Sequence, residues 1–261
     1  MRRLRCSTWP EPPLLELVQE IPSTNAALVA RIGGGDCLLE GHWLVAERQT
    51  AGRGRAGRVW SDGFGNFMGS TPVRLAPHET APQTLALVAG LALWDAIAAC
   101  APGLPGLYLK WPNDVLVGQA KLAGILLERV GDTVIVGIGV NLASAPVVPG
   151  RETAALAALG HRVERDAFAA VLAQHWATRL ESWHAGQWPA LRAAWEERAV
   201  PRGTLVSVND RDHGPIMGGF AGVDAYGVAQ LRLADGRLLA IHAGDVDLVG
   251  EPAAPAARGD A

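Results

Sequence analysis

The apolar positions before residue 200 recur with two different spacings. Helical spacing, or a long apolar run after a cap signal, predicts helices at residues 26–32, 80–99, 165–184 and 188–198. Short apolar runs between turn residues predict strands at residues 42–47, 66–73, 107–111, 115–117, 124–129 and 133–140. The last four strands adjoin along the chain, which favours antiparallel pairing.

The pattern changes after Gly203. Short β-rich runs at residues 204–208, 216–223, 228–233, 238–242 and 246–249 are separated by turn pairs such as Asn209-Asp210 and Asp235-Gly236. They predict a small barrel of about five strands. We therefore divide the chain into a first domain at 1–200, a barrel at 201–250 and a flexible Ala/Pro-rich tail at 251–261.

Composition narrows the class of protein. With 49% hydrophobic and 19% charged residues and a net charge of −3, the chain is neither disordered nor a strongly basic nucleic-acid binder. The longest apolar run, residues 85–99, is too short to span a bilayer and contains Asp95. Cys6, Cys37 and Cys100 lack paired spacing, and Trp9-Pro10 interrupts the start where a signal peptide would be apolar. These features predict a cytoplasmic protein without a membrane partner.

The densest chemical signal is the loop at residues 47–60, which reads E-R-Q-T-A-G-R-G-R-A-G-R-V-W. Its glycines allow close backbone approach, and Arg53, Arg55 and Arg58 match phosphate or carboxylate geometry. We expect a mobile clamp that orders on a phosphorylated ligand. An exposed basic turn is the plain alternative. The glycine spacing also fits a dinucleotide-binding loop, but no helix or βαβ unit follows.

A second candidate region runs from residue 110 to 128. Asn113 and Asp114 follow Pro112 in a turn, where an amide and a carboxylate can face a ligand or a hydrated Mg²⁺. Lys121 precedes an apolar strand, and a half-shielded ammonium there would act strongly on developing negative charge. The plain alternatives are turn chemistry and a lysine that points to water. Gly137 and Gly139 lie near the end of the predicted strand at 133–140, and Asn141 follows it. The glycines suggest backbone crowded by a ligand, and Asn141 suggests an amide that reads a base.

Other catalytic classes find no support in the sequence. The seven histidines lack metal-ligand spacing, and the G-x-S-x-G motif of serine hydrolases is absent.

Five motifs together resemble the biotin protein ligases, the biotin–[acetyl-CoA-carboxylase] ligases. They are S-T-N at 23–25, G-R-G-R-x-G-R-x-W at 52–60, K-W-P-N-D at 110–114, K-L-A-G-I-L-L-E at 121–128 and G-x-G-x-N at 137–141. The resemblance covers residues 21–141 and is looser beyond them. It implies an α+β, biotin/lipoate-ligase-like catalytic domain with a mixed, largely antiparallel sheet, followed by a small SH3-like β-barrel.

The resemblance also implies a two-step reaction. Biotin and Mg·ATP form biotinyl-5′-adenylate and pyrophosphate, and a lysine of the biotin carboxyl carrier protein domain of acetyl-CoA carboxylase then attacks, releasing AMP. Lipoate ligases are the nearest rival, and the arginine-rich loop favours biotin. A DNA-binding biotin sensor is the rival from another class, but about twenty residues precede Ser23, too few for a DNA-binding module to fold. A homodimer is left open.

Residue roles follow from the same resemblance. It implies Lys121 as the catalytic cation and Arg55 as the residue that holds the adenylate. The implied biotin contacts are Ser23, Thr24, Asn25, Gln49, Gly52, Arg53, Arg55, Trp60, Lys121 and Gly124. The implied nucleotide contacts are Arg53, Arg55, Arg58, Lys110, Asn113, Asp114, Lys121 and Asn141, with Asp114 also a ligand for Mg²⁺. Residues 142–150 contain no aromatic side chain, so what stacks on adenine is left open.

Overall fold

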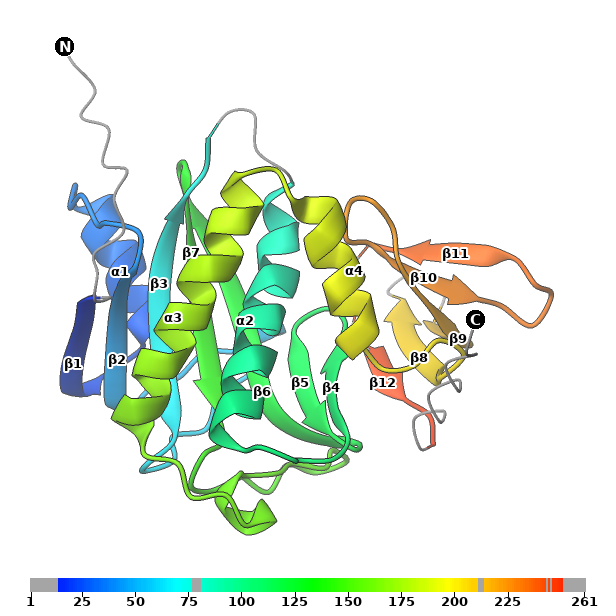
Figure 1. Cartoon of the computed structure of the whole chain (residues 1–261), viewed down its shortest axis with the longest axis horizontal. Helices are drawn as coiled ribbons and strands as arrows, with labels where there is room; N and C mark the ends of the chain where they lie inside the picture. Colours follow the sequence, from blue (N-terminus) through cyan, green and yellow to red (C-terminus); the bar gives the residue numbers. More distant parts are fainter. Residues whose placement is uncertain (1–13, 77–80, 211–213, 243, 245, 251–261) are drawn as a thin grey trace.

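Two β-sheets organise the chain, and the computed structural model describes residues 14–76, 81–210, 214–242, 244 and 246–250 (Figure 1). The first sheet and its helices comprise β1 Leu14–Ile21, α1 Thr24–Gly33, β2 His42–Gln49, β3 Phe67–Arg74, α2 Leu85–Cys100, β4 Leu107–Lys110, β5 Asp114–Val117, β6 Ala120–Val130, β7 Thr133–Val140, α3 Arg165–His184 and α4 Trp188–Arg198. The second sheet comprises β8 Leu205–Asp210, β9 Gly214–Val223, β10 Ala229–Arg232, β11 Leu238–Ile241 and β12 Val246–Leu248. The tail expected at 251–261 lies outside the described residues.

The strand order gives a mixed sheet and a small antiparallel sheet. The seven strands of the first follow the order β1-β2-β3-β7-β6-β5-β4, and those of the second follow β11-β10-β9-β8-β12. Among the pairs of named strands in the described residues, only β1–β2 is parallel. The predicted α+β class with a largely antiparallel sheet is confirmed. The change of sheet falls between Arg198 and Leu205, and the division at residue 200 stays a prediction.

Helices cover both faces of the larger sheet. Side chains alternate along a strand, so neighbouring residues of β2 face opposite layers. Trp43 and Val45 join the main core with α2 and α3, whereas Leu44 packs with Leu28 of α1 and Ile135 of β7 in a second cluster. Helix α1 therefore lies on the face opposite to α2, α3 and α4 (Figure 1).

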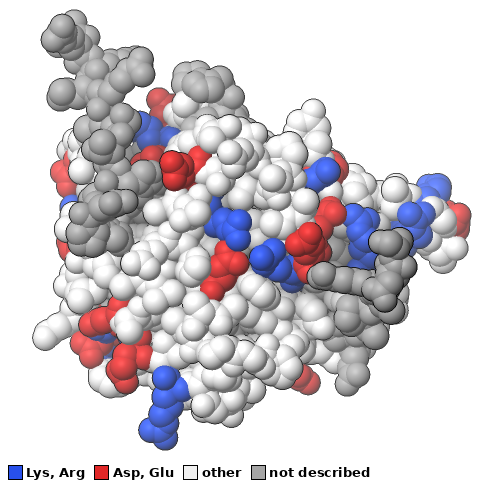
Figure 2. Space-filling model, viewed as in Figure 1, with Lys and Arg blue, Asp and Glu red and all other residues white. Residues whose placement is uncertain are grey.

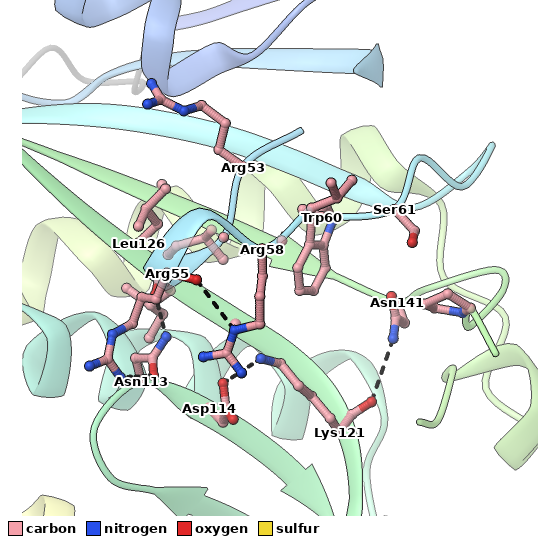
Figure 3. A pocket seen from close by; sticks show the side chains of 18 of the residues that line it. Arg53, Arg55, Arg58, Trp60, Ser61, Asn113, Asp114, Lys121, Leu126 and Asn141 are labelled. Atoms are coloured by element: carbon pink, nitrogen blue, oxygen red, sulfur yellow. Dashed lines mark hydrogen bonds and ion pairs between the residues drawn. The ribbon is translucent and has the colours of Figure 1, made fainter. Parts of the chain in front are cut away.

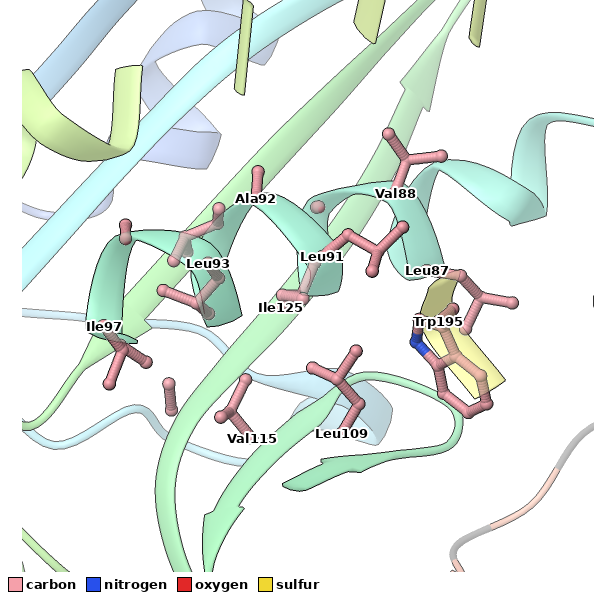
Figure 4. Packing of buried hydrophobic residues seen from close by; sticks show 14 of the residues in the cluster. Leu87, Val88, Leu91, Ala92, Leu93, Ile97, Leu109, Val115, Ile125 and Trp195 are labelled. Carbon is pink, nitrogen blue, oxygen red and sulfur yellow. The ribbon is translucent and has the colours of Figure 1, made fainter. Parts of the chain in front are cut away.

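Helix α2 is the centre of the main core. Apolar side chains project from all sides of this helix. They pack toward Leu109 of β4, Val115 of β5 and Ile125 of β6, and toward Trp195 of α4 (Figure 4). Within the described residues, the segment Pro82–Cys100 is the helix long and apolar enough to cross a bilayer. Because 61% of its apolar window is buried inside the protein, it has the character of a core helix.

The two sheets share one apolar core and are joined by hydrogen bonds. Trp111 Nε1 donates to Gly227 O at 2.9 Å, and Trp188 Nε1 donates to Ala225 O at 2.7 Å. The ring of Trp195 meets that of Phe220 edge-on with centroids 6.4 Å apart. The smaller sheet is therefore fixed against the larger one.

Charged side chains lie scattered on the face shown in Figure 2, with basic and acidic groups intermixed among wide uncharged areas. Some of them pair across helices. Arg179 NH2 of α3 lies 2.6 Å from Asp95 Oδ2 of α2, and Arg198 Nε of α4 lies 3.7 Å from Oδ1 of the same carboxylate. These ion pairs connect the three helices over the sheet.

Three elements differ most from the sequence-based expectation, and several others differ by one or two residues at their ends. Strand β1 was not predicted, because its pattern L-L-E-L-V-Q-E-I lacks a regular alternation, and its Leu14 and Leu17 are exposed. Helix α2 begins at Leu85 rather than at residue 80, since a 3-10 turn, Pro82–Thr84, precedes it; residue 80 itself lies outside the described part. Strand β6 begins at Ala120, so Lys121 lies within the strand rather than before it.

Candidate active site

A cavity of about 160 Å³ lies between the loop that follows β2 and the inner part of the larger sheet. Its walls come from the start of α1, the loop at 53–61, the β4–β5 turn, β6, β7 and the segment after β7, and Val246 of β12 also reaches it. All the predicted site residues line it except Gly52. Gly52 packs against the main chain of Trp60, because a Cβ at Gly52 would lie 2.5 Å from the Trp60 carbonyl oxygen. The individual roles of these residues stay predictions.

Glycines form the floor of this cavity. Gly124 of β6 and Gly139 of β7 lie opposite each other in the antiparallel pair. A Cβ at Gly139 would overlap the Trp60 ring, and a Cβ at Gly137 would overlap the Asn25 amide. A Cβ at Gly124 would lie 3.1 Å from Lys121 Nζ. The bare backbone therefore leaves room for the side chains above it. The expected crowding of the β7 glycines is present, but it comes from Trp60 and Asn25 of this chain, and crowding by a ligand stays a prediction.

A buried polar network forms one end of the cavity. Gln49 Oε1 accepts hydrogen bonds from Thr24 N at 2.7 Å and from Thr24 Oγ1 at 3.1 Å. Thr24 Oγ1 lies 2.7 Å from Ser70 Oγ, which donates to Asn25 Oδ1 at 2.6 Å. Asn25 Nδ2 in turn donates to Glu128 Oε2 at 2.9 Å. These contacts hold hydroxyl and amide groups in fixed positions, which suits recognition of a neutral polar ring.

The glycine- and arginine-rich loop folds back over the cavity as a small hairpin (Figure 3). Trp60 N donates to Gly52 O at 3.0 Å, and Gly54 N donates to Arg58 O at 2.7 Å. Arg55 NH1 donates to Asn113 Oδ1 at 2.9 Å, so the loop is held against the β4–β5 turn. The loop has one folded arrangement here, and its ordering by a ligand stays a prediction.

The loop arginines do not all point the same way. Arg55 and Arg58 extend toward Asn113 and Asp114, whereas Arg53 turns away from them (Figure 3). Arg53 NH1 lies 3.1 Å from Glu128 Oε1 and so extends the buried polar network that includes Asn25 and Glu128. Two of the three guanidinium groups therefore add positive charge at the end of the cavity where Lys121 lies.

Trp60 separates the loop from the floor. Its ring rests over Gly139, and Lys121 Nζ lies 5.8 Å from the ring centroid. Its indole Nε1 is buried, and it has no hydrogen-bond partner among the described residues. A buried donor without a partner costs about 1–3 kcal/mol, so a ligand acceptor in this wall would be stabilised.

Asp114 lies between the two lysines of the chain. Lys121 Nζ is 2.5 Å from Asp114 Oδ1, and Lys110 Nζ is 3.3 Å from Asp114 Oδ2. Burial acts to raise the pKa of Asp114, but the ammonium groups of Lys121 and Lys110 outweigh it and hold that pKa below its usual value. Burial lowers the pKa of Lys121, and Asp114 partly opposes this. The lysine does not simply point to water, since its side chain is 18% exposed.

This arrangement does not fit the magnesium ligand expected at Asp114. Both carboxylate oxygens already contact ammonium groups, and a divalent cation there would face two positive charges at close range. Across the described residues, no group of three or more His, Cys, Asp or Glu side chains could hold a metal ion.

Asn141 lies at the far side of the cavity from the loop arginines (Figure 3). Its Nδ2 donates to Ala154 O at 3.1 Å and to Lys121 O at 3.5 Å, and its side chain is buried. The amide thus holds the segment after β7 against β6. A contact between Asn141 and adenine stays a prediction.

Ser70, Glu128 and Val246 belong to the site without having been predicted as site residues. A polar Ser70 inside the apolar strand β3 was a usable signal, because such a hydroxyl needs a partner when buried. Glu128 stood at the end of a recognised motif. Val246 carried no signal, since only the fold brings it to a site more than a hundred residues away in the chain.

Comparisons with known proteins agree with this geometry. The biotin/lipoate A/B protein ligase family model matches residues 37–142, and the biotin protein ligase C terminal domain model matches residues 205–249. A biotin–[acetyl-CoA-carboxylase] ligase of Paracoccus denitrificans is 38% identical over 233 residues, covering 82% of this chain and 92% of that protein. The chain belongs to the biotin protein ligase family.

Further relatives support the membership. A biotin–[acetyl-CoA-carboxylase] ligase of Mycobacterium tuberculosis is 36% identical over 238 residues, covering 89% of this chain and 88% of that protein. The biotin protein ligase of Aquifex aeolicus in complex with biotin and ATP has a TM-score of 0.78 and 27% identity, covering 90% of this chain and 98% of the other. The resemblance seen in the five motifs is therefore confirmed, together with the predicted mixed-sheet domain and small C-terminal β domain.

Proposed function

We propose that this chain is a biotin–[acetyl-CoA-carboxylase] ligase. The observation that carries the proposal is a single cavity with two unlike ends. One end has Lys121, Arg55 and Arg58, and the other has the neutral network of Thr24 and Gln49 over a glycine floor. An acyl adenylate has matching halves, a charged phosphoryl group and a neutral vitamin ring.

In the first step, a carboxylate oxygen of biotin attacks the α-phosphorus of ATP, and the bond to pyrophosphate breaks. Negative charge grows on the α-phosphoryl oxygens, and the Lys121 ammonium stabilises it in a site of low dielectric. Arg55 and Arg58 add two permanent positive charges from the loop. Mg²⁺ bound to the ATP substrate would neutralise part of the phosphate charge, and none of the described residues is proposed to hold it.

In the second step, the amine of the carrier lysine attacks the acyl carbon of biotinyl-5′-adenylate. The bond between the acyl carbon and the phosphate oxygen breaks, AMP leaves, and the proton lost by the attacking amine goes to solvent. The hairpin loop covers the adenylate between the steps and keeps water from the reactive anhydride. Trp60 forms the wall between the loop and the glycine floor.

The remaining assignments follow the two ends of the cavity. Biotin contacts Ser23, Thr24, Asn25, Gln49, Gly124 and Trp60, together with the backbone near Gly52 and Arg53. The nucleotide contacts Asn113 and Asn141. The partner is the biotin carboxyl carrier domain of acetyl-CoA carboxylase, and the reaction takes place in the cytoplasm. Independence from DNA and membranes stays a prediction, and the oligomeric state is left open.

Intact-mass measurement tests the proposal directly. The chain is incubated with biotin, ATP, Mg²⁺ and an isolated biotin carrier domain, and the carrier is expected to gain the mass of one biotinyl group. A carrier whose acceptor lysine is replaced by arginine is the matched control and should gain nothing. An unmodified wild-type carrier under conditions in which the chain binds biotin would contradict the proposal.

Lipoate is the second candidate acid, because the first family model covers both biotin and lipoate ligases. The match to a biotin ligase C-terminal domain and the P. denitrificans relative favour biotin. Acid-dependent exchange of labelled pyrophosphate into ATP separates the two acids. We expect exchange with biotin; exchange with lipoate alone would reverse the choice.

A further inference from the structure

Lys110 and Asp114 close the turn between β4 and β5. Lys110 is the last residue of β4, Asp114 is the first of β5, and the two are opposite each other in the antiparallel pair. Their side chains are 8% and 7% exposed, and Asp114 also contacts Lys121. The three groups therefore form one largely buried unit, which we call the lysine–aspartate triad.

The triad carries a net positive charge of one. Asp114 paired with Lys121 alone would be neutral as a unit, and its attraction for phosphoryl oxygens would fall accordingly. Lys110 contacts the second carboxylate oxygen, so Asp114 divides its charge between two ammonium groups. The result is a positive charge that Asp114 does not cancel, next to the cavity that Lys121 faces.

The smaller sheet fixes Lys110 in this position. Lys110 Nζ donates a buried hydrogen bond of 2.7 Å to Val246 O, at the start of β12. An ammonium has three donors, and the contacts to Asp114 and Val246 commit two of them. Lys110 is therefore directed at the carboxylate and at the second sheet.

We propose that Lys110 is a positioning residue for adenylate formation, held by the Val246 carbonyl and acting on the substrate through Asp114 and Lys121. The inference rests on the proposed function and adds to it. It replaces direct nucleotide contact by Lys110 with an indirect role, and it makes the C-terminal sheet part of the electrostatics of the site.

The variant Lys110→Met tests this role, because it removes the charge and keeps the length of the side chain. The kcat of biotin-dependent ATP–pyrophosphate exchange is expected to fall at least about tenfold, while the KM for ATP changes less than about threefold. Calorimetric titration of this variant with biotin alone is expected to give a Kd within about twofold of wild type. Such a Kd would show that the variant is folded and that the biotin end of the cavity is intact. Lys110→Arg restores the charge and is expected to recover most of the lost kcat.

Trp188→Phe is the matched control for the contact between the sheets. It removes the 2.7 Å hydrogen bond to Ala225 O without changing charge, and kcat is expected to stay at the wild-type value. Equal losses of kcat in this variant and in Lys110→Met would overturn the proposal, because they would indicate general loosening. An increased KM for ATP at unchanged kcat in Lys110→Met would overturn it in favour of direct nucleotide binding, and unchanged kinetics would also overturn it.

Two further outcomes are distinguishable. If Lys110→Met does not fold, the arginine variant decides: near wild-type kcat supports the role of the charge, and lost kcat with intact biotin binding contradicts it. Wild-type protein that catalyses no exchange would instead contradict the proposed function, whatever the variants do.

Discussion

Lys121 combines a proposed catalytic role with an observed structural contact. It lies in β6 and provides one of the two ammonium groups around the buried Asp114. We expect Lys121→Met to lower the exchange rate by about 10²–10³-fold, because it removes the ammonium proposed to stabilise the developing charge. Since Asp114 keeps Lys110, the free energy of unfolding should fall by only about 1–3 kcal/mol.

Pyrophosphate exchange and chemical denaturation measure these two effects. Unchanged exchange in a folded Lys121→Met protein would remove Lys121 from the mechanism. Unfolding at all denaturant concentrations would show instead that Lys110 alone cannot stabilise the buried carboxylate.

The pH dependence of the reaction follows from the same lysine. Burial lowers the pKa of Lys121. In the proposed mechanism, the charged form of this lysine stabilises the phosphoryl oxygens. Activity is therefore retained below that pKa and lost as the pH rises through it. We expect the basic limb of kcat for exchange to fall below the ordinary lysine value of about 10.4. A limb at or above that value would contradict the shift.

Gly137 gives a test of the cavity floor. A Cβ at this position would overlap the Asn25 amide, which connects Ser70 to Glu128. Gly137→Ala is expected to lower the free energy of unfolding by about 1–3 kcal/mol and to weaken biotin binding, because Asn25 must move. Calorimetry with biotin measures the second effect. Gly131→Ala is unsuitable as a control because its φ is 57°, whereas Gly33→Ala adds a methyl group where no atom lies within 4 Å.

At the scale of elements, the hairpin loop is the part that we propose controls carrier specificity. Arg55 connects the loop to the β4–β5 turn through Asn113. We expect Arg55→Gly to release biotinyl-5′-adenylate early and to label proteins without selectivity. Asn113→Ala breaks the same hydrogen bond and keeps the guanidinium. Because Asn113 is also a proposed nucleotide contact, the KM for ATP of this variant is measured together with its adenylate leak. Labelling of an unrelated protein measures the leak, and strict carrier selectivity in Arg55→Gly would contradict the role.

Several elements could be predicted from the sequence, and others could not. The long helices α3 and α4 matched their predicted ranges, because a sustained helical spacing and clear stops define them. Strand β1 escaped prediction because it is an edge strand whose outward residues include Leu14 and Leu17. The position of Lys121 inside β6 also escaped, since a polar residue near a strand end does not mark the boundary.

At the scale of the whole molecule, the two sheets behave as connected parts. They share one apolar core, and Trp111, Trp188 and Lys110 donate across the junction. We expect Trp188→Phe to lower the free energy of unfolding by about 1 kcal/mol within a single cooperative transition. Denaturation followed by fluorescence and by far-UV circular dichroism tests this. Two separated transitions in the wild-type protein would contradict a joint core.

The motif residues of the candidate site could be predicted from the sequence, but the contacts among them could not. The motif residues could be selected from the sequence because their order and spacing resemble a known family. The contacts that give them their environment depend on tertiary structure: Ser70 reaches Asn25, and Val246 reaches Lys110, only after the sheets assemble. For Asp114, the sequence suggested a metal ligand, and only the fold showed two lysines around it.

The paired glycines of β6 and β7 have a consequence for altering substrate range. Where main chain rather than side chains forms the floor, substitutions can only shrink the space and cannot deepen it. Variants selected to accept bulkier acids should therefore carry their changes in the walls, at Trp60 or in the polar end around Thr24. Libraries directed at Gly124 and Gly139 should yield inactive clones.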